Sequence, residues 1–330
     1  MNAARVRVFA PASIGNVIAG FDVMGAAVAA LDGAPLGDTV TVEPAAETQL
    51  VVEGPFAARV PAAAAENLCW RATLAVASGR GIPLPALRMT LCKAMPVGSG
   101  LGSSSASAVA GAVATAAWFD AVDVRELPSF LEWRAARAGE LLDAAGKAEA
   151  HAAGATHLDN VAPCLLGGWQ LLTPAGPRSL PVPPGLRWVL ACPDFELATR
   201  TARAVLPAQL DRATAVAHSA NLAAAVHALH SGEWLLLKAA LRDVVAEPHR
   251  AALVPGFREV QSAARGAGAL ACSLSGAGPA VVALVEPASV QAVCAAMCRG
   301  FAEAGVSSSV RVCAVDPIGA RPGAADVVDQ

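Results

Sequence analysis

Alternating apolar and polar positions divide the first half of the chain into short strands between helical segments. Alternation predicts strands over Val6–Ala10, Thr39–Glu43, Gln49–Glu53 and Leu87–Lys93. Apolar positions at helical spacing predict helices over Asn67–Ser78, Ser103–Trp118 and about Leu131–Ala144. Residues 154–168 are rich in loop-forming residues, with one apolar helical turn near 161–166. We therefore predict two domains, residues 1–155 and residues 156–330.

The second half mixes strands and helices in an order typical of an α+β fold. The predicted strands are Gly168–Leu172, Arg187–Ala191, Leu270–Leu274, Ala280–Val285 and Ser309–Val315. The predicted helices are Arg212–His230, Glu233–Val245, Phe257–Gly266 and Ser289–Ala304. This mixture of strands and helices predicts an α+β arrangement with an antiparallel sheet. The small, polar tail after Pro317 is expected to fray.

Composition and charge narrow the classes of protein. The chain has 330 residues, which is enough for a sizeable core, and much of its hydrophobic content is alanine. The net charge of −3 is well mixed, so a nucleic-acid partner is not expected. The eight cysteines are scattered without a CxxC pair and are expected to be reduced thiols of a cytoplasmic protein.

The longest uncharged stretch does not predict a membrane span. It runs from Ala94 to Phe119, but its first half contains Pro96, three glycines and three consecutive serines. The apolar remainder, Ala106–Phe119, is shorter than the ~20 residues that a spanning helix needs. No apolar segment follows the first arginines, so a secretory signal is not expected either.

The segment most informative for chemistry is Pro96–Ala106, which reads PVGSGLGSSSA and joins a predicted strand to a predicted helix. Glycines at alternate positions let a backbone approach a ligand closely, and a helix start offers unpaired N–H groups to an anion. A flexible turn that only caps the helix is the alternative. No lysine follows as in a Walker loop, and Ser103 breaks a dinucleotide GxGxxG pattern.

Three motifs in order resemble those of the GHMP kinases: Ala10–Asp22 (APASIGNVIAGFD), Pro96–Ala106, and Ser273–Pro279 (SLSGAGP). The resemblance implies an α+β, two-domain fold, with an N-terminal domain similar to ribosomal protein S5 domain 2 and a ferredoxin-like C-terminal domain. It also implies transfer of a phosphoryl group from ATP to a hydroxyl. The residues implied to contact ATP are Asn67, Pro96, Val97, Gly98, Ser99, Gly100, Leu101, Gly102, Ser103, Ser104, Ser105, Ala106, Gly276 and Gly278.

Further segments resemble the homoserine kinases within this family: HLDNVAP at 157–163, TRTARAVLP at 199–207 and DVVAEPHR at 243–250. The resemblance implies L-homoserine and ATP as ligands, a role in threonine biosynthesis, and a homodimer. Arginine suits a carboxylate through paired N–H donors. The residues implied to bind the acceptor are Asn16, Asp22, His157, Thr199, Arg203 and Arg250, with the two arginines on its carboxylate and Asp22 on its ammonium.

The resemblance also implies a metal site and a reacting position. Ser104 and Glu149 would hold Mg²⁺. Asn160 stands at the reacting position, which implies catalysis by positioning without a side-chain base, whereas a one-residue shift of the match would make Asp159 the base. Two alternatives remain open, namely a kinase for mevalonate, shikimate or a sugar, and a non-catalytic relative that senses a ligand.

Overall fold

The computed structural model describes residues 5–61, 63–153 and 158–323. Its strands are β1 (Val6–Gly15), β2 (Met24–Ala30), β3 (Gly37–Pro44), β4 (Gln49–Glu53), β5 (Leu87–Cys92), β6 (Trp169–Thr173), β7 (Gly176–Leu180), β8 (Arg187–Pro193), β9 (Ala271–Leu274), β10 (Val281–Val285), β11 (Ser308–Val315) and β12 (Arg321–Pro322). Its α-helices are α1 (Leu68–Gly79), α2 (Ser103–Phe119), α3 (Leu127–Ala136), α4 (Ala138–Ala153), α5 (Leu158–Leu166), α6 (Thr199–Ala204), α7 (Arg212–Ser231), α8 (Trp234–Ala240), α9 (Glu247–Arg250), α10 (Phe257–Gly266) and α11 (Val290–Glu303). The mixed α+β class predicted from the pattern is confirmed.

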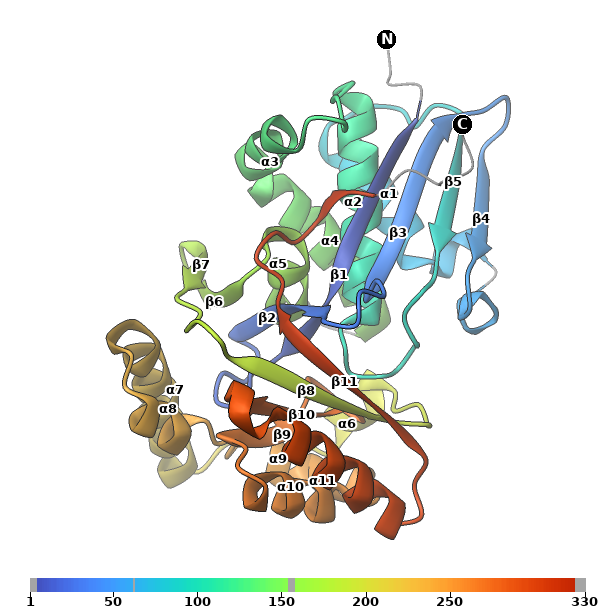
Figure 1. Cartoon of the computed structure of the whole chain (residues 1–330). Coiled ribbons are helices and arrows are strands. Elements are labelled where there is room, and N and C mark those ends of the chain that lie inside the picture. The colour runs from blue at the N-terminus through green and yellow to red at the C-terminus, as the bar shows by residue number, and fades with distance from the viewer. Residues whose placement is uncertain (1–4, 62, 154–157, 324–330) are drawn as a thin grey trace.

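Strand β1 connects the two halves of the molecule. Its first part pairs antiparallel with β3, from Val6 opposite Val42, and its last part pairs with β2. The full strand order along the sheet is β4-β5-β3-β1-β2-β11-β8-β10-β9. Strands β1 and β2 therefore join the sheet of the first half to that of the second half, in the centre of Figure 1. The predicted antiparallel sheet of the second half, β11-β8-β10-β9, is confirmed.

Alanine-rich helices cover the sheet of the first half. Helix α2 packs on β1 and β3 and is flanked by α1 and α4, while α10 and α11 lie against the strands of the second half (Figure 1). Nearly every residue of α2 is buried, because alanine lets neighbouring backbones approach closely. At Gly111 an added Cβ would lie 2.5 Å from the carbonyl oxygen of Cys69. The alanine content therefore serves tight helix packing.

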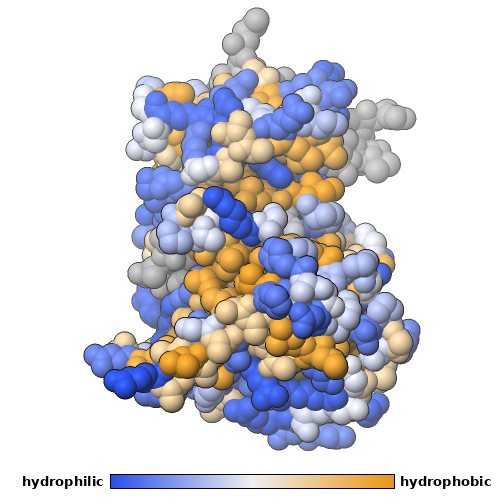
Figure 2. All heavy atoms as spheres, turned by 90° about the vertical axis from the view of Figure 1, so that its left-hand side faces the viewer, coloured by the Kyte–Doolittle hydropathy of each residue, from blue (hydrophilic) through white to orange (hydrophobic). Residues whose placement is uncertain are grey.

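The surface carries an apolar region on one side. Figure 2 views the side on which α3, β7, α7 and α8 lie in Figure 1, and shows apolar side chains gathered across its middle. Leu235 of α8 is 85% exposed. No helix among the described residues is long and apolar enough to cross a membrane. All eight cysteines are unpaired in the structure.

Several predicted element boundaries are wrong. The helix expected over 131–144 is two helices, α3 and α4, separated at Arg137, and the helix expected over 233–245 ends at Ala240. The loop-rich stretch 154–168 contains a full helix, α5. The tail does not fray up to residue 323, because β12 pairs with β1, with Pro322 opposite Val8. The division at residue 155 stays a prediction, with the sheet continuous across both halves.

Candidate active site

The glycine-rich loop between β5 and α2 is held from behind by the second half of the chain. Its carbonyl oxygens at 98, 99 and 100 accept hydrogen bonds from Leu197 N (3.1 Å), Ala280 N (3.1 Å) and Ser275 Oγ (2.7 Å). The next carbonyl, at 101, accepts from Ser13 N at 3.0 Å. Four consecutive carbonyls therefore have partners, and among the described residues no backbone amide from 98 to 102 donates to another backbone group.

The conformation of the loop depends on glycine. Gly98, Gly100 and Gly102 have φ values of 65°, 82° and 65°, in the left-handed region that other residues avoid. Gly102 is the N-cap of the 17-residue helix α2, and no side chain caps that helix. The free amides of the loop and of the first helical turn thus form a concave set of donors at the positive end of a helix dipole. Such a surface binds phosphate.

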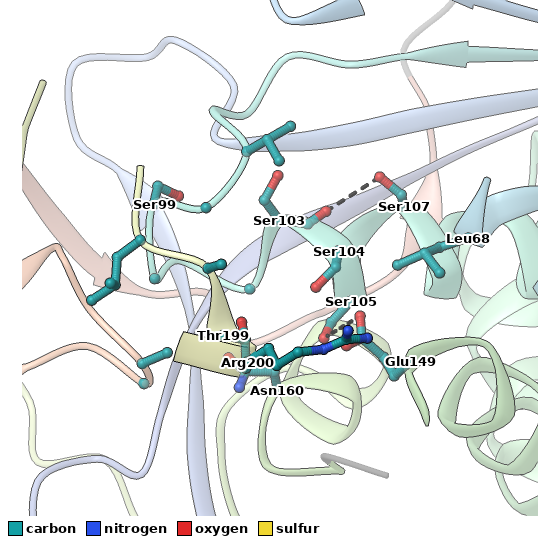
Figure 3. A pocket seen from close by; sticks show the side chains of 18 of the residues that line it. Leu68, Ser99, Ser103, Ser104, Ser105, Ser107, Glu149, Asn160, Thr199 and Arg200 are labelled. Atoms are coloured by element: carbon teal, nitrogen blue, oxygen red, sulfur yellow. Dashed lines mark hydrogen bonds between the residues drawn. The ribbon is translucent and has the colours of Figure 1, made fainter. Parts of the chain in front are cut away.

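The loop lines a cavity of about 570 Å³ that extends to both halves of the chain. Figure 3 shows serines of α2 on one side and Asn160, Thr199 and Arg200 on another. The predicted site residues that line it are Asn16, Asp22, Asn67, Val97, Gly98, Ser99, Gly100, Gly102, Ser103, Ser104, Ser105, Glu149, Asp159, Asn160, Thr199, Arg203, Arg250 and Gly276. Pro96, Leu101, Ala106 and Gly278 do not line it, and His157 lies outside the described residues.

Asn67 lines the cavity next to Leu68, which Figure 3 shows on the other side of the view from Thr199. As the N-cap of α1, its Oδ1 accepts from the backbone amides of Cys69 (3.0 Å) and Trp70 (3.4 Å). Its Nδ2 is buried and has no partner among the described residues. A buried amide donor without an acceptor costs free energy, so it is poised to donate to a ligand. An aromatic base with ring nitrogens supplies such an acceptor.

Glu149 of α4 lies beneath the first turn of α2. It is buried, it accepts from Ser105 Oγ at 3.1 Å, and burial raises the pKa of its carboxyl. Ser104 is exposed to the cavity on the same turn (Figure 3). The described residues contain no group of three or more His, Cys, Asp or Glu side chains that could hold a metal. A single carboxylate beside a hydroxyl fits Mg²⁺, which keeps most of its ligands from water and phosphate.

The opposite end of the cavity contains charged groups suited to an amino acid. Arg203 of α6 donates to Asp22 Oδ1 at 2.6 Å, across 181 residues of sequence. Arg250 of α9 is buried, and it donates to the carbonyl oxygens of Ala202 (2.9 Å) and Gly276 (3.0 Å). Burial lowers the pKa of Arg250, with the nearby Arg203 charge acting in the same direction. This end therefore has cationic donors for an anion and one carboxylate for a cation.

Asn16 belongs to the framework of this end. Its Oδ1 accepts from Asp22 N (3.0 Å) and its Nδ2 donates to the Gly276 carbonyl (3.2 Å). Asn16, Val17 and Ile18 all have positive φ values, between 38° and 66°, a strained run that the surroundings must stabilise. The Gly276 carbonyl receives both Asn16 and Arg250, so the third motif joins the acceptor end to the loop rather than only facing ATP.

Asp159 and Asn160 lie in the first turn of α5, and both line the cavity. Asn160 Oδ1 accepts from Ser13 Oγ at 2.9 Å, which orients its amide. Asp159 Oδ2 accepts from Asn16 N at 3.1 Å. Burial, reinforced by the charge of Asp22, raises the pKa of Asp159 to about 7. The hydrogen bond from Asn16 N links Asp159 to the strained run that begins at Asn16. A pKa of about 7 also suits a general base.

Sequence reasoning missed a buried ion pair below the loop. Lys93 Nζ donates to Asp38, to Ser103 O (2.8 Å) and to Ser107 Oγ (2.9 Å), and Asp38 also accepts from the backbone amides of Ala94 and Met95. The side chains of Lys93 and Asp38 are 3% and 0% exposed. The sequence offered only a lysine at the end of a strand that alternates apolar and polar residues, directly before the glycine-rich loop. The pair fixes the end of β5 to the first turn of α2.

Comparisons with known proteins identify the family of this chain. Residues 67–168 match the GHMP kinases N terminal domain, and residues 225–303 match the GHMP kinases C terminal domain. A homoserine kinase from Cytophaga hutchinsonii is 34% identical, with 96% of this chain and 97% of that chain covered and a TM-score of 0.83. The chain belongs to the GHMP kinase family. Members of this family are ATP-dependent small-molecule kinases.

More distant structures share the fold. A putative homoserine kinase from Listeria monocytogenes is 22% identical, covers 96% of this chain and 98% of its own, and has a TM-score of 0.65. Lactococcus lactis galactokinase, complexed with galactose, is 16% identical, covers 97% and 95%, and has a TM-score of 0.66. The GHMP fold thus carries different acceptor specificities, and the acceptor must be inferred from the residues of the site.

Proposed function

We propose that this GHMP kinase transfers the γ-phosphoryl group of ATP to the hydroxyl of L-homoserine, giving O-phospho-L-homoserine. The observation that carries the proposal is the end of the cavity formed by Asp22, Arg203 and Arg250. An amino-acid acceptor brings a carboxylate for the arginines and an ammonium for Asp22. The similarity to the Cytophaga hutchinsonii homoserine kinase supports the same acceptor. A neutral sugar would bring neither a carboxylate for the arginines nor an ammonium for Asp22.

Different residues of the cavity bind different parts of the two substrates. The amides of the loop and of α2 bind the phosphates, and Asn67 Nδ2 donates to the base. Glu149 and Ser104 would hold Mg²⁺, which would supply positive charge to neutralise the phosphates of ATP. Asn160, oriented by Ser13, lies between the phosphates and the acceptor. We propose that positioning and electrostatics carry the rate, with Asp159 as the one alternative base.

An ADP-release assay with Mg-ATP tests the acceptor. Turnover of L-homoserine, mevalonate, shikimate and galactose is measured for three proteins. These are the wild type, Arg203→Ala and Arg212→Ala. Arg212 is exposed at the start of α7, outside the cavity, so it serves as the matched control. Turnover on homoserine alone is expected, with KM for homoserine raised about tenfold or more in Arg203→Ala, since a hydrogen bond between charged groups contributes ~1.5–3 kcal/mol.

The assay also separates the competing functions. Turnover on another acceptor would keep the kinase and contradict homoserine. Binding of ATP without turnover on any acceptor would favour a ligand-sensing protein. We also propose that the chain forms a homodimer, supported by the apolar region in Figure 2, and analytical ultracentrifugation gives the mass that decides this.

A further inference from the structure

Five cationic side chains line the cavity in the described part of the chain: Arg59, Lys93, Arg200, Arg203 and Arg250. Four of them already have partners in the structure, which are Glu196 for Arg59, Asp38 for Lys93, Asp22 for Arg203, and backbone carbonyls for Arg250. Within residues 5–61, 63–153 and 158–323, Arg200 forms no hydrogen bond or ion pair. Its donors are therefore free for a ligand.

The segment that carries Arg200 is fixed at both ends. Leu197 N donates to the Gly98 carbonyl of the phosphate loop at 3.1 Å, just before α6 begins. Later in α6, the carbonyl of the buried Ala202 accepts from Arg250 Nε at 2.9 Å. Arg200 thus lies in the sequence between an anchor on the nucleotide side and an anchor on the acceptor side.

Figure 3 shows the direction of the side chain. Arg200 extends from α6 across the cavity, on the side where Ser105 and Glu149 lie, with Asn160 and Thr199 near the base of the side chain in this view. Within the described part of the chain, Glu149 accepts from Ser105 Oγ and forms no ion pair with Arg200. An arginine that points into this space and is not neutralised by a carboxylate has its charge available for a phosphate.

The chemistry of the site needs such a charge. The loop has no lysine and offers backbone amides, which carry only partial charges. In phosphoryl transfer the negative charge spreads over the equatorial oxygens of the moving group, and a guanidinium stabilises it through paired N–H donors. We propose that Arg200 binds the γ-phosphoryl oxygens of ATP and stabilises them during transfer, an inference that rests on the proposed kinase function.

The step balances without a further reactant. The acceptor hydroxyl oxygen forms a bond to the γ-phosphorus, and the bond from that phosphorus to the oxygen bridging to the β-phosphorus breaks. The electron pair of the broken bond stays on ADP, and the hydroxyl proton leaves to phosphate or water. Arg200 stays protonated throughout, because guanidinium does not deprotonate in proteins. Its role is to hold the oxygens, not to move a proton.

Calorimetric binding of two nucleotides tests the proposal directly. ADP and the non-hydrolysable ATP analogue AMPPNP are titrated, each with Mg²⁺, into the wild type, Arg200→Ala, Arg200→Lys and the control Arg212→Ala. Arg200→Ala is expected to bind ADP within twofold of the wild type and AMPPNP about tenfold or more weakly, as for a lost charged hydrogen bond. Arg200→Lys keeps the charge but not the paired donors. Its affinity for AMPPNP is expected to lie between those of the wild type and Arg200→Ala.

Kinetics give a second readout on the same variants. Arg200→Ala is expected to lower kcat about 10²–10³-fold, with KM for the acceptor changed little, as for loss of one donor to a transition-state oxygen. Added guanidinium is expected to restore part of the rate in Arg200→Ala and to leave the wild type unchanged.

Several outcomes would overturn the inference. Equal weakening of ADP and AMPPNP would place Arg200 on the base or the inner phosphates, and an effect on the acceptor KM alone would place it on the acceptor. Unchanged binding and turnover would remove it from the site. If the wild type turned over no acceptor, the proposed function would fail, while the difference between ADP and AMPPNP would still decide the role of Arg200.

Discussion

Replacement of Gly100 by alanine isolates the contribution of the loop backbone to nucleotide binding. At Gly100, φ is 82°, and an added Cβ would lie 2.7 Å from the carbonyl oxygens of both Ser275 and Gly278. Ordinary contact begins at 3.4 Å, so each contact is short by 3.4 − 2.7 = 0.7 Å. Both neighbours are backbone atoms, which cannot rotate away as the end of a side chain can. The loop itself must therefore move.

The expected magnitude follows from two effects. A left-handed conformation costs an L-residue ~1–2 kcal/mol. Movement of the loop also breaks the 2.7 Å bond from Ser275 Oγ to the Gly100 carbonyl, and a typical hydrogen bond contributes ~1 kcal/mol. We expect Gly100→Ala to lower the free energy of unfolding by ~2–3 kcal/mol. Since ~1.4 kcal/mol is tenfold in a binding constant, ADP should bind about tenfold or more weakly.

The assay pairs urea unfolding with calorimetric titration of Mg-ADP. Gly139→Ala is the control, because Gly139 lies in α4 with nothing within 4 Å of its added Cβ. Alanine in a helix is favoured over glycine by ~0.5–1 kcal/mol, so the control should be at least as stable as the wild type and bind ADP equally. Wild-type ADP affinity in Gly100→Ala would refute the reasoning that the loop backbone forms the phosphate site.

Two further predictions concern buried charges. Lys93→Met should lower the free energy of unfolding by ~3–5 kcal/mol, because it leaves Asp38 charged and buried, whereas Lys147→Met, at an exposed i,i+4 pair, should change it by less than ~0.5 kcal/mol. Equal losses in urea unfolding would contradict this. The folded state keeps the Asp159 proton up to about pH 7, while the unfolded state releases it near pH 3.8. The free energy of unfolding of the wild type should therefore fall relative to that of Asp159→Asn as the pH rises from about 4 to 7, by up to ~4 kcal/mol. Parallel stability profiles of the two proteins would show that Asp159 is not buried as a neutral acid.

Local pattern determined much of this protein. Strands with one buried face alternate in the sequence, and β3, β5 and β11 lie close to their predicted ranges. The loop at 96–106 was identified because three glycines at alternate positions, directly before a helix, are a local requirement for left-handed backbone. Eighteen predicted site residues line one cavity, because the motifs that identified the family also carry its binding groups.

Only the tertiary structure decided how these segments work together. The donors that hold the loop carbonyls come from residues 197, 275 and 280, and Arg203 reaches Asp22 over 181 residues, so no local pattern could reveal them. The pairing of β12 with β1 was likewise invisible, because a two-residue strand has no periodicity. Arg200 gave no signal of its own: an arginine in sequence is the same letter on a solvated surface or over a phosphate site, and only its surroundings distinguish the two.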